Sequence, residues 1–140
     1  REPLWRHLIN YRCGTGHSVS FVGNVHEGPH ALNGRNTVVF QPGMIVTDEP
    51  GVYEGGQVGI RIENELMCVH KADNQYGTFL GFEPIMFVPI ATSPVVPGVL
   101  TRDELDWLNN YHRQVFEKLA PRLNDEEREW LAKKCAAIGC

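Results

Sequence analysis

The stretch Gly43-Met44-Ile45-Val46-Thr47-Asp48-Glu49-Pro50-Gly51-Val52-Tyr53, written GMIVTDEPGVY, decides how the central part of this chain folds. Its apolar β-forming residues predict a strand over 44–47, bounded by glycine and proline. Two carboxylates end the run. Side chains alternate across a strand, so we expect Asp48 and Glu49 on opposite faces, with at least one of them pointing inward.

A second charged stretch, Gly59-Ile60-Arg61-Ile62-Glu63-Asn64-Glu65, follows it. Alternation places Arg61, Glu63 and Glu65 on one face of a strand predicted over 59–63. Two explanations stay open at this point. The face can be solvated, with Arg61 paired to Glu63 or Glu65 in salt bridges that contribute little to stability. Alternatively, its carboxylates point into a site.

The rest of the chain before Pro97 is rich in short apolar runs, and the residues after Pro97 are helical in pattern. Strands are predicted over 37–40, 65–70 and 85–90. Capping boxes at Thr101–Glu104 and Asn124–Glu127 predict two helices, the first ended by Pro121. We therefore expect an α+β fold, with a β-rich part over 1–96 and a helical extension over 97–140 packed on it.

Composition excludes several classes of protein. The chain has 140 residues, 42% of them hydrophobic, and a net charge of −4, which predicts one domain or part of one and gives no footprint for nucleic acid. No apolar run reaches the roughly 18 residues of a membrane span. The cysteines form no C-x-x-C pair, which predicts reduced thiols and a cytoplasmic location; they are Cys13, Cys68, Cys135 and Cys140.

The stretch GTGHSVSFVGNVHE over residues 14–27 contains two histidines nine residues apart, the first of them directly after a glycine-rich turn. A single imidazole such as His17 or His26 is often a hydrogen-bonded structural group. If His17 met Glu49 and Glu63, however, one imidazole with carboxylate oxygens would suit Mn²⁺ and would tolerate Zn²⁺ or Co²⁺. Neither spacing nor periodicity decides between these explanations.

The order of the motifs resembles the catalytic domain of Xaa-Pro aminopeptidases, a family of pita-bread-fold metallopeptidases. The matching segments are GTGH ending at His17, NVHEGP over 24–29, GMIVTDEPGVY over 43–53, GIRIEN over 59–64, GFEP over 81–84 and DWLNNYH over 106–112. The resemblance implies the C-terminal half of a pita-bread fold, a curved and mostly antiparallel sheet with C-terminal helices. It also implies cleavage of the bond that precedes a proline in second position, with two Mn²⁺ ions as cofactors and proline-containing peptides as substrates.

Residue roles follow from the same resemblance. It makes His17 and Glu49 ligands of one metal ion, Glu63 a carboxylate that bridges two ions, and Glu49 the acceptor of a proton from water. His26 matches a histidine that binds substrate and helps to move protons. The polar residues that support the site, or line its substrate side, are Arg61, Tyr53 and Cys13.

The chain departs from the family pattern in ways that lower the expected activity. Cys13 replaces a substrate-site histidine, and Ser18 and Ser20 replace glycines. Two aspartate ligands and a further histidine of the family lie upstream of residue 1, and residue 1 is Arg rather than Met. We therefore expect the C-terminal portion of an enzyme, inactive alone, that needs its N-terminal part and can form a homodimer. The alternatives are a non-catalytic pita-bread module that binds peptides or proteins, and a prolidase-like sibling.

Overall fold

The computed structural model describes residues 1–96 and 98–139 and divides into two compact units, Arg1–Met86 and Phe87–Cys140. Pro97, where the sequence changes character, and Cys140 lie outside the described residues. The boundary between the units precedes the segment 87–96, which the sequence pattern groups with the β-rich part. The assignment of 1–96 and 97–140 as domains stays a prediction.

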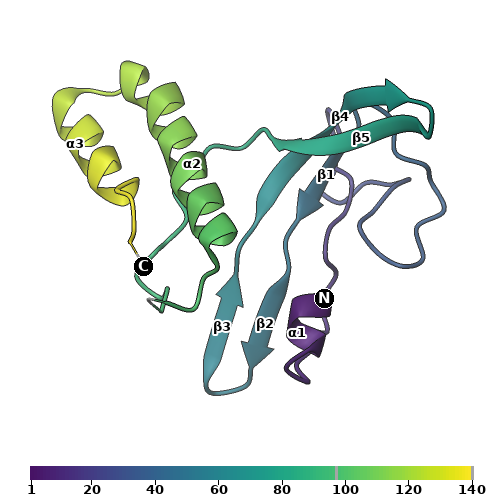
Figure 1. Ribbon diagram of the computed structural model, residues 1–140, viewed down its shortest axis with the longest axis horizontal. Helices are drawn as coiled ribbons and strands as arrows, with labels where there is room; N and C mark the ends of the chain where they lie inside the picture. Colours follow the sequence, from purple (N-terminus) through teal and green to yellow (C-terminus); the bar gives the residue numbers. More distant parts are fainter. Residues whose placement is uncertain (97, 140) are drawn as a thin grey trace. The chain divides into compact units, whose positions relative to one another are not determined.

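The first unit holds one short helix and two antiparallel sheets (Figure 1). Its elements are α1 (Glu2–Trp5), β1 (Ile45–Asp48), β2 (Gly51–Glu54), β3 (Val58–Arg61), β4 (Asn64–Asn74) and β5 (Gly77–Pro84). The three-stranded sheet has the order β1-β4-β5, and β2 pairs with β3. The strands predicted near 44–47, 59–63 and 65–70 are confirmed, whereas the sequence pattern did not predict β2 and β5.

The two sheets are successive parts of one hairpin. In the first ladder Asp48 faces Asn64, and in the second Gly51 faces Arg61, with two residues on each arm between them. The register therefore continues unchanged from β1 and β4 into β2 and β3. The same residue count therefore gives the facing positions on the two arms between the ladders, where no backbone pairing is formed.

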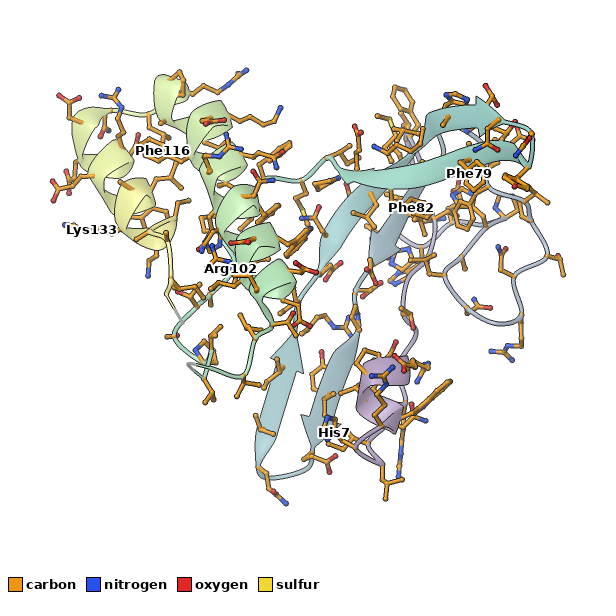
Figure 2. The ribbon with its side chains drawn as sticks, in the orientation of Figure 1. His7, Phe79, Phe82, Arg102, Phe116 and Lys133 are labelled. Carbon is orange, nitrogen blue, oxygen red and sulfur yellow. The ribbon has the colours of Figure 1, made fainter. Side chains whose placement is uncertain are left out.

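The strand predicted over 37–40 is wrong. The Asn36 side chain forms hydrogen bonds with both backbone groups of Val38. Its Nδ2 donates to the Val38 carbonyl at 2.9 Å, and its Oδ1 accepts from the Val38 N–H at 3.2 Å. Such local side-chain bonds compete with a ladder. The apolar residue Phe40 instead packs edge-on against Phe82 of β5, at 5.3 Å between ring centroids. Figure 2 shows the Phe82 and Phe79 side chains along this strand.

The second unit is a helical pair, α2 (Arg102–Leu119) and α3 (Asp125–Lys134), joined by the 3₁₀ turn η1 (Ala120–Arg122). Both predicted capping boxes form, at Thr101 and at Asn124. The core of the unit lies between the helices and contains the buried side chains Tyr111, Val115 and Leu131. Within residues 1–96 and 98–139, no helix is both long enough and apolar enough to cross a membrane.

The strand predicted over 85–90 is also wrong, because side chains of α2 occupy the backbone groups that a ladder would need. The Tyr111 hydroxyl donates to the Val88 carbonyl at 2.9 Å and accepts from the Val88 N–H at 3.3 Å. Nε2 of the fully buried His112 accepts from the Ile90 N–H at 3.0 Å. Val88 and Ile90 are thus held by a helix, whereas Ile85 N still donates to the Glu65 carbonyl of β4 at 2.9 Å.

Candidate metal centre

A glycine brings the first histidine against β1. The segment that precedes His17 runs along the edge of β1 that β4 leaves free, where Thr47 N donates to the His17 carbonyl at 2.9 Å. Ser18 forms an antiparallel bridge with Val46. A Cβ at Gly16 would lie 1.8 Å from the Thr47 carbonyl oxygen, so no larger residue fits at this approach. The glycine-rich turn therefore has a steric cause.

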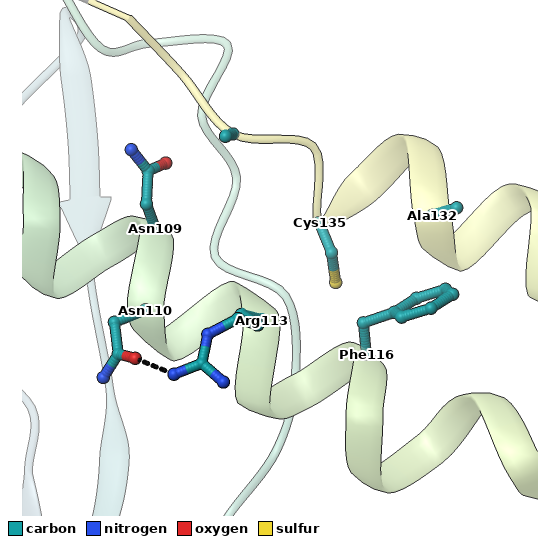
Figure 3. Close-up of a pocket in the computed structure, with 7 residues that line it drawn as sticks. Asn109, Asn110, Arg113, Phe116, Ala132 and Cys135 are labelled. Carbon is teal, nitrogen blue, oxygen red and sulfur yellow. Dashed lines mark hydrogen bonds between the residues drawn. The ribbon is translucent and has the colours of Figure 1, made fainter.

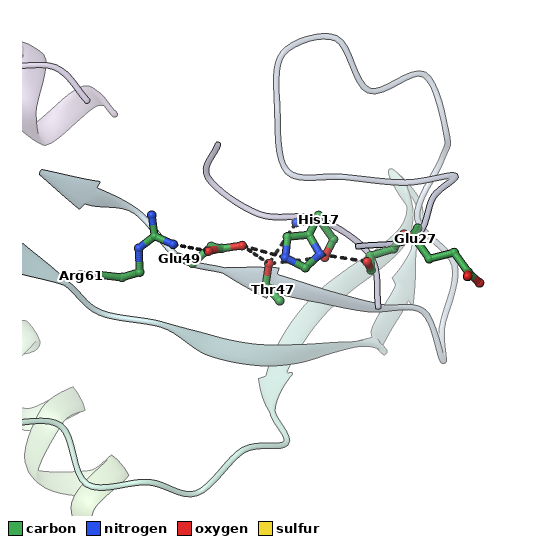
Figure 4. Close-up of polar contacts among 6 residues, drawn as sticks. His17, Glu27, Thr47, Glu49 and Arg61 are labelled. Atoms are coloured by element: carbon green, nitrogen blue, oxygen red, sulfur yellow. Dashed lines mark hydrogen bonds and ion pairs between the residues drawn. The ribbon is translucent and has the colours of Figure 1, made fainter. Parts of the chain in front are cut away.

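The imidazole of His17 has a defined tautomer. Its Nδ1 lies 2.9 Å from the Ser18 carbonyl oxygen, and because a carbonyl only accepts, Nδ1 carries the proton. In the neutral imidazole Nε2 is then an acceptor, and it lies 2.9 Å from Oε1 of Glu49 (Figure 4). Two acceptor atoms at this distance repel each other unless a proton or a cation lies between them. The contact is therefore suited to a cation.

The second histidine joins the same cluster. The rings of His17 and His26 are 4.0 Å apart between centroids, and His17, His26 and Glu49 each offer one ligand atom within 4.8 Å of the others. Ser18 anchors the loop that carries His26, because its hydroxyl donates to the Glu27 carbonyl and its own carbonyl accepts from the Glu27 N–H at 3.2 Å. Ser18 is thus a buried anchor of this loop.

Glu49 is buried and held from two sides. Its Oε1 accepts from the Thr47 hydroxyl at 3.0 Å, and its Oε2 accepts from Arg61 Nη1 at 2.5 Å. Arg61 therefore pairs with Glu49 and not, as one explanation of the charged strand had it, with Glu63 or Glu65. Burial acts to lower the pKa of Arg61, but the neighbouring Tyr53 and Glu49 outweigh it and raise that pKa. The guanidinium remains charged.

Tyr53 and Arg61 share one face of the β2–β3 hairpin above two glycines. A Cβ at Gly51 would lie 2.8 Å from the Tyr53 ring and 3.0 Å from Arg61 Nε, and one at Gly59 would lie 3.0 Å from the same ring. Both glycines thus leave room for these side chains. Cys13 reaches the same place, since its thiol donates to the Gly51 carbonyl at 3.3 Å. Of these polar groups, Arg61 is the one that contacts Glu49 directly.

Glu63 stands apart from the cluster in this structure. Its side chain is exposed, and it is not a member of the ligand group formed by His17, His26 and Glu49. The continuous hairpin register nevertheless gives Glu49 and Glu63 facing positions on the two arms, within the interruption between the ladders.

Asp48 is half-buried, and burial raises the pKa of its carboxyl group.

Thr47 is a site residue that the sequence pattern alone did not single out. It is almost fully buried and contacts both His17 and Glu49. Alternation along β1 carried the signal, because Thr47 and Glu49 are two positions apart and so share a face. A hydroxyl two residues before an inward carboxylate is thus a feature that can be found from sequence.

The donor set fits a first-row divalent metal. Two ligand atoms at about 2.1 Å from one ion, roughly at right angles, lie about 3 Å apart. The 2.9 Å contact between His17 Nε2 and Glu49 Oε1 matches that spacing. A histidine ligand usually donates its other N–H to a carbonyl or carboxylate, as His17 does to Ser18. Imidazole with carboxylate suits Mn²⁺, Zn²⁺ or Co²⁺.

A pocket of ≈ 560 Å³ lies in the second unit, between α2 and α3 (Figure 3). Its wall includes Phe116, Ala132 and Cys135, with Asn110 and Arg113 joined by a hydrogen bond of 2.5 Å. Burial raises the pKa of the Cys135 thiol, which favours its neutral form over the nucleophilic thiolate.

Comparison with known families covers nearly the whole chain. Residues 1–70 match the model of metallopeptidase family M24, and residues 78–138 match the model of the C-terminal region of peptidase M24. Aminopeptidase P1 of Lotus japonicus is 43% identical over 145 residues, 99% of this chain and 22% of the relative. The probable Xaa-Pro aminopeptidase P of Coprinopsis cinerea is 41% identical, over 99% of this chain and 24% of the relative.

A solved structure agrees. The X-prolyl aminopeptidase of Caenorhabditis elegans, described as a cytosolic enzyme with a di-nuclear active site, has a TM-score of 0.81 and 37% identity to this chain. The match covers 99% of this chain and 23% of that protein. It confirms the α+β class and the half of a pita-bread sheet with C-terminal helices. The chain spans about a quarter or less of the proteins that it matches.

Proposed function

This chain belongs to metallopeptidase family M24, and on that premise we propose that it is the C-terminal portion of an Xaa-Pro aminopeptidase. The complete enzyme releases the N-terminal residue from peptides that have proline in second position. The observation that carries this proposal is the contact of 2.9 Å between His17 Nε2 and Glu49 Oε1, two acceptor atoms placed as metal ligands are placed.

In the proposed metal site His17 and Glu49 would hold one ion, and Glu63, at the facing position on the other arm, would be a ligand shared between that ion and a second. Mn²⁺ is the proposed metal, and Zn²⁺ or Co²⁺ would also suit these donors. The matched relatives are four to five times longer than this chain. We infer that the remaining ligands come from the N-terminal part of the same enzyme.

The bound ions supply a water molecule of lowered pKa and stabilise negative charge on the substrate carbonyl oxygen. The groups of this chain handle binding and protons around them. Glu49 would accept a proton from that water, while Arg61 holds Oε2 and keeps the carboxylate in place. His26, exposed beside His17, can hydrogen-bond to the substrate and transfer a proton.

Recognition of proline needs a surface that does not rely on an amide N–H, because the bond to be cleaved has none. We propose that Tyr53, Arg61 and Cys13 supply the substrate side of the site. A thiol donates only weakly, so Cys13 anchors the peptide less firmly than an imidazole would. We also propose a cytosolic location, in keeping with the description of the Caenorhabditis elegans enzyme. A homodimer stays a prediction.

Hydrolysis of an Xaa-Pro dipeptide and of a longer Xaa-Pro peptide by the full-length protein tests the proposal. We expect turnover of the longer peptide, its loss after chelation and its return with Mn²⁺. Glu49→Gln should remove it, and Lys71→Gln, far along β4, is the matched surface control. Binding of peptide without cleavage would identify a non-catalytic module, and cleavage of the dipeptide alone would identify a prolidase-like enzyme.

The 140-residue chain alone should show no turnover, because it offers too few ligands for two ions. Appreciable hydrolysis by the purified chain would contradict this ligand count.

A further inference from the structure

Thr47 lies at the centre of the cluster, and its hydroxyl contacts two of the groups that the site depends on. Oγ1 accepts a hydrogen bond from the backbone N–H of His17 at 3.0 Å. The same oxygen lies 3.0 Å from Glu49 Oε1 and 3.4 Å from the His17 carbonyl oxygen. Only 2% of Thr47 is exposed, so water does not compete for these contacts.

The direction of each bond follows from the number of protons. A threonine hydroxyl has one proton to donate and two lone pairs. The His17 N–H takes one lone pair, and the proton goes to the nearer and charged acceptor, Glu49 Oε1. The hydroxyl therefore accepts a hydrogen bond from the backbone of His17 and donates one to the carboxylate of Glu49.

We propose that Thr47 is a positioning residue of the metal site, whose hydroxyl fixes the distance between the His17 imidazole and the Glu49 carboxylate. This inference rests on the proposed function. Oε1 is the oxygen that faces His17 Nε2, so a bond from Thr47 to that oxygen sets the orientation of the carboxylate where the two ligand atoms meet. Groups that orient metal ligands in this way typically change metal affinity by about 10- to 100-fold when they are removed.

A purely structural role makes a different prediction. The segment next to β1 has backbone bonds that do not involve the hydroxyl, from Thr47 N to the His17 carbonyl and from Glu49 N to the Thr15 carbonyl. These bonds survive when Thr47 is replaced by valine, which has nearly the same shape. The fold should therefore persist while the carboxylate loses its orienting donor.

Mn²⁺ binding to the full-length protein, measured by calorimetry beside its thermal unfolding, tests the proposal. Thr47→Val should raise the Kd for Mn²⁺ about 10- to 100-fold, while Thr47→Ser, which keeps the hydroxyl, should stay within about threefold of the wild type. Thr78→Val is the matched control, because it removes an exposed threonine hydroxyl that donates to Asp73 at 2.7 Å, and its Kd should not change. If Thr47→Val does not fold, Thr47→Ala replaces it with the same expectation.

The outcomes separate the two proposals. An unchanged Kd in Thr47→Val, or equal loss in Thr47→Val and Thr47→Ser, would overturn the positioning role alone. Absence of Mn²⁺ binding by the wild-type protein would overturn the proposed function and this inference together. Wild-type affinity in Thr47→Ser with weak binding in Thr47→Val would support both.

Discussion

Arg61 lies on the opposite side of the Glu49 carboxylate from His17. Nη1 of Arg61 is 2.5 Å from Oε2, and Nε2 of His17 is 2.9 Å from Oε1. The two oxygens therefore have separate partners. Oε2 is paired with the permanently charged Arg61, and Oε1 faces His17, with which it can bind a shared metal ion. This division lets the carboxylate keep its direction whether or not an ion is bound.

Replacing Arg61 by glutamine in the full-length protein should lower kcat/KM for an Xaa-Pro peptide by about 10-fold or more, because the carboxylate loses the partner that orients it. The kcat/KM of Arg61→Lys should lie between those of the wild type and of Arg61→Gln, since an ammonium group keeps the charge but not the planar geometry of the guanidinium. Steady-state kinetics at saturating Mn²⁺ measure the effect. Wild-type kcat/KM in Arg61→Gln would exclude this role.

Gly16→Ala should destabilise the fold by about 3 kcal/mol or more, because the new methyl group would meet a backbone oxygen that cannot move aside easily. Gly14→Ala is the control: nothing lies within 4 Å of its added Cβ, and its effect should stay within about 0.5 kcal/mol. Denaturant unfolding of both variants gives the comparison. Equal stability of the two would mean that the turn has another way to approach β1.

Ser18→Ala should loosen the loop that carries His26, because the Glu27 carbonyl loses the hydroxyl that bonds to it. Amide hydrogen exchange across residues 20–27 should speed up while exchange in β4 stays as it was. Ser20→Ala provides the comparison, as it changes a serine of the same loop. Faster amide exchange in Ser20→Ala, with unchanged exchange in Ser18→Ala, would show that Ser20 and not Ser18 anchors the loop.

The second unit should lose stability on acidification. Burial lowers the pKa of His112 below its ordinary value of 6.5. Between the folded and unfolded pKa values, the unfolded chain binds more protons, so the free energy of unfolding rises with pH in that window. The contribution is fully present above about pH 6.5 and is lost as pH falls below it.

Chemical unfolding at several values between about pH 5 and pH 8 measures this dependence. His112→Gln, which keeps an acceptor for the Ile90 N–H, should flatten the curve below about pH 6.5. A curve as steep as that of the wild type would assign the effect to other groups.

The helices were predictable because their signals are local. Thr101 and Asn124 each begin a capping box whose partner is three residues away, so the sequence alone contains both halves of the interaction. The family resemblance, carried by ordered short motifs, is likewise confirmed.

The strands were harder to predict because a ladder needs a partner that the sequence does not name. Residues 85–90 have the β-branched composition of a strand, yet Tyr111 and His112 of α2 bind their backbone groups. No propensity of the segment itself reports a hydroxyl and an imidazole that come from more than twenty residues later. The short strand β2 was missed for the same reason, since its pairing rests on the register that it shares with β3.

The site was predicted in part. The sequence grouped His17, Glu49 and Glu63 as ligands, and the structure brings the first two together with His26 while Glu63 remains exposed. The ligand roles stay proposals. Alternation places Thr47 on the same face as Glu49, but the contact of its hydroxyl with the backbone of His17, thirty residues away, does not follow from the sequence.

The unbroken register of the long hairpin limits where insertions and deletions can be accepted during the evolution of this protein. Glu49 and Arg61 sit on different arms, and their separation is set by counting residues along each arm from the shared pairing. The tip at residues 55–57 can be lengthened or shortened without moving either side chain. An insertion of one residue between Asp48 and Gly51 would leave three residues on one arm against two on the other, and so would break the shared pairing that holds the arginine beside its carboxylate.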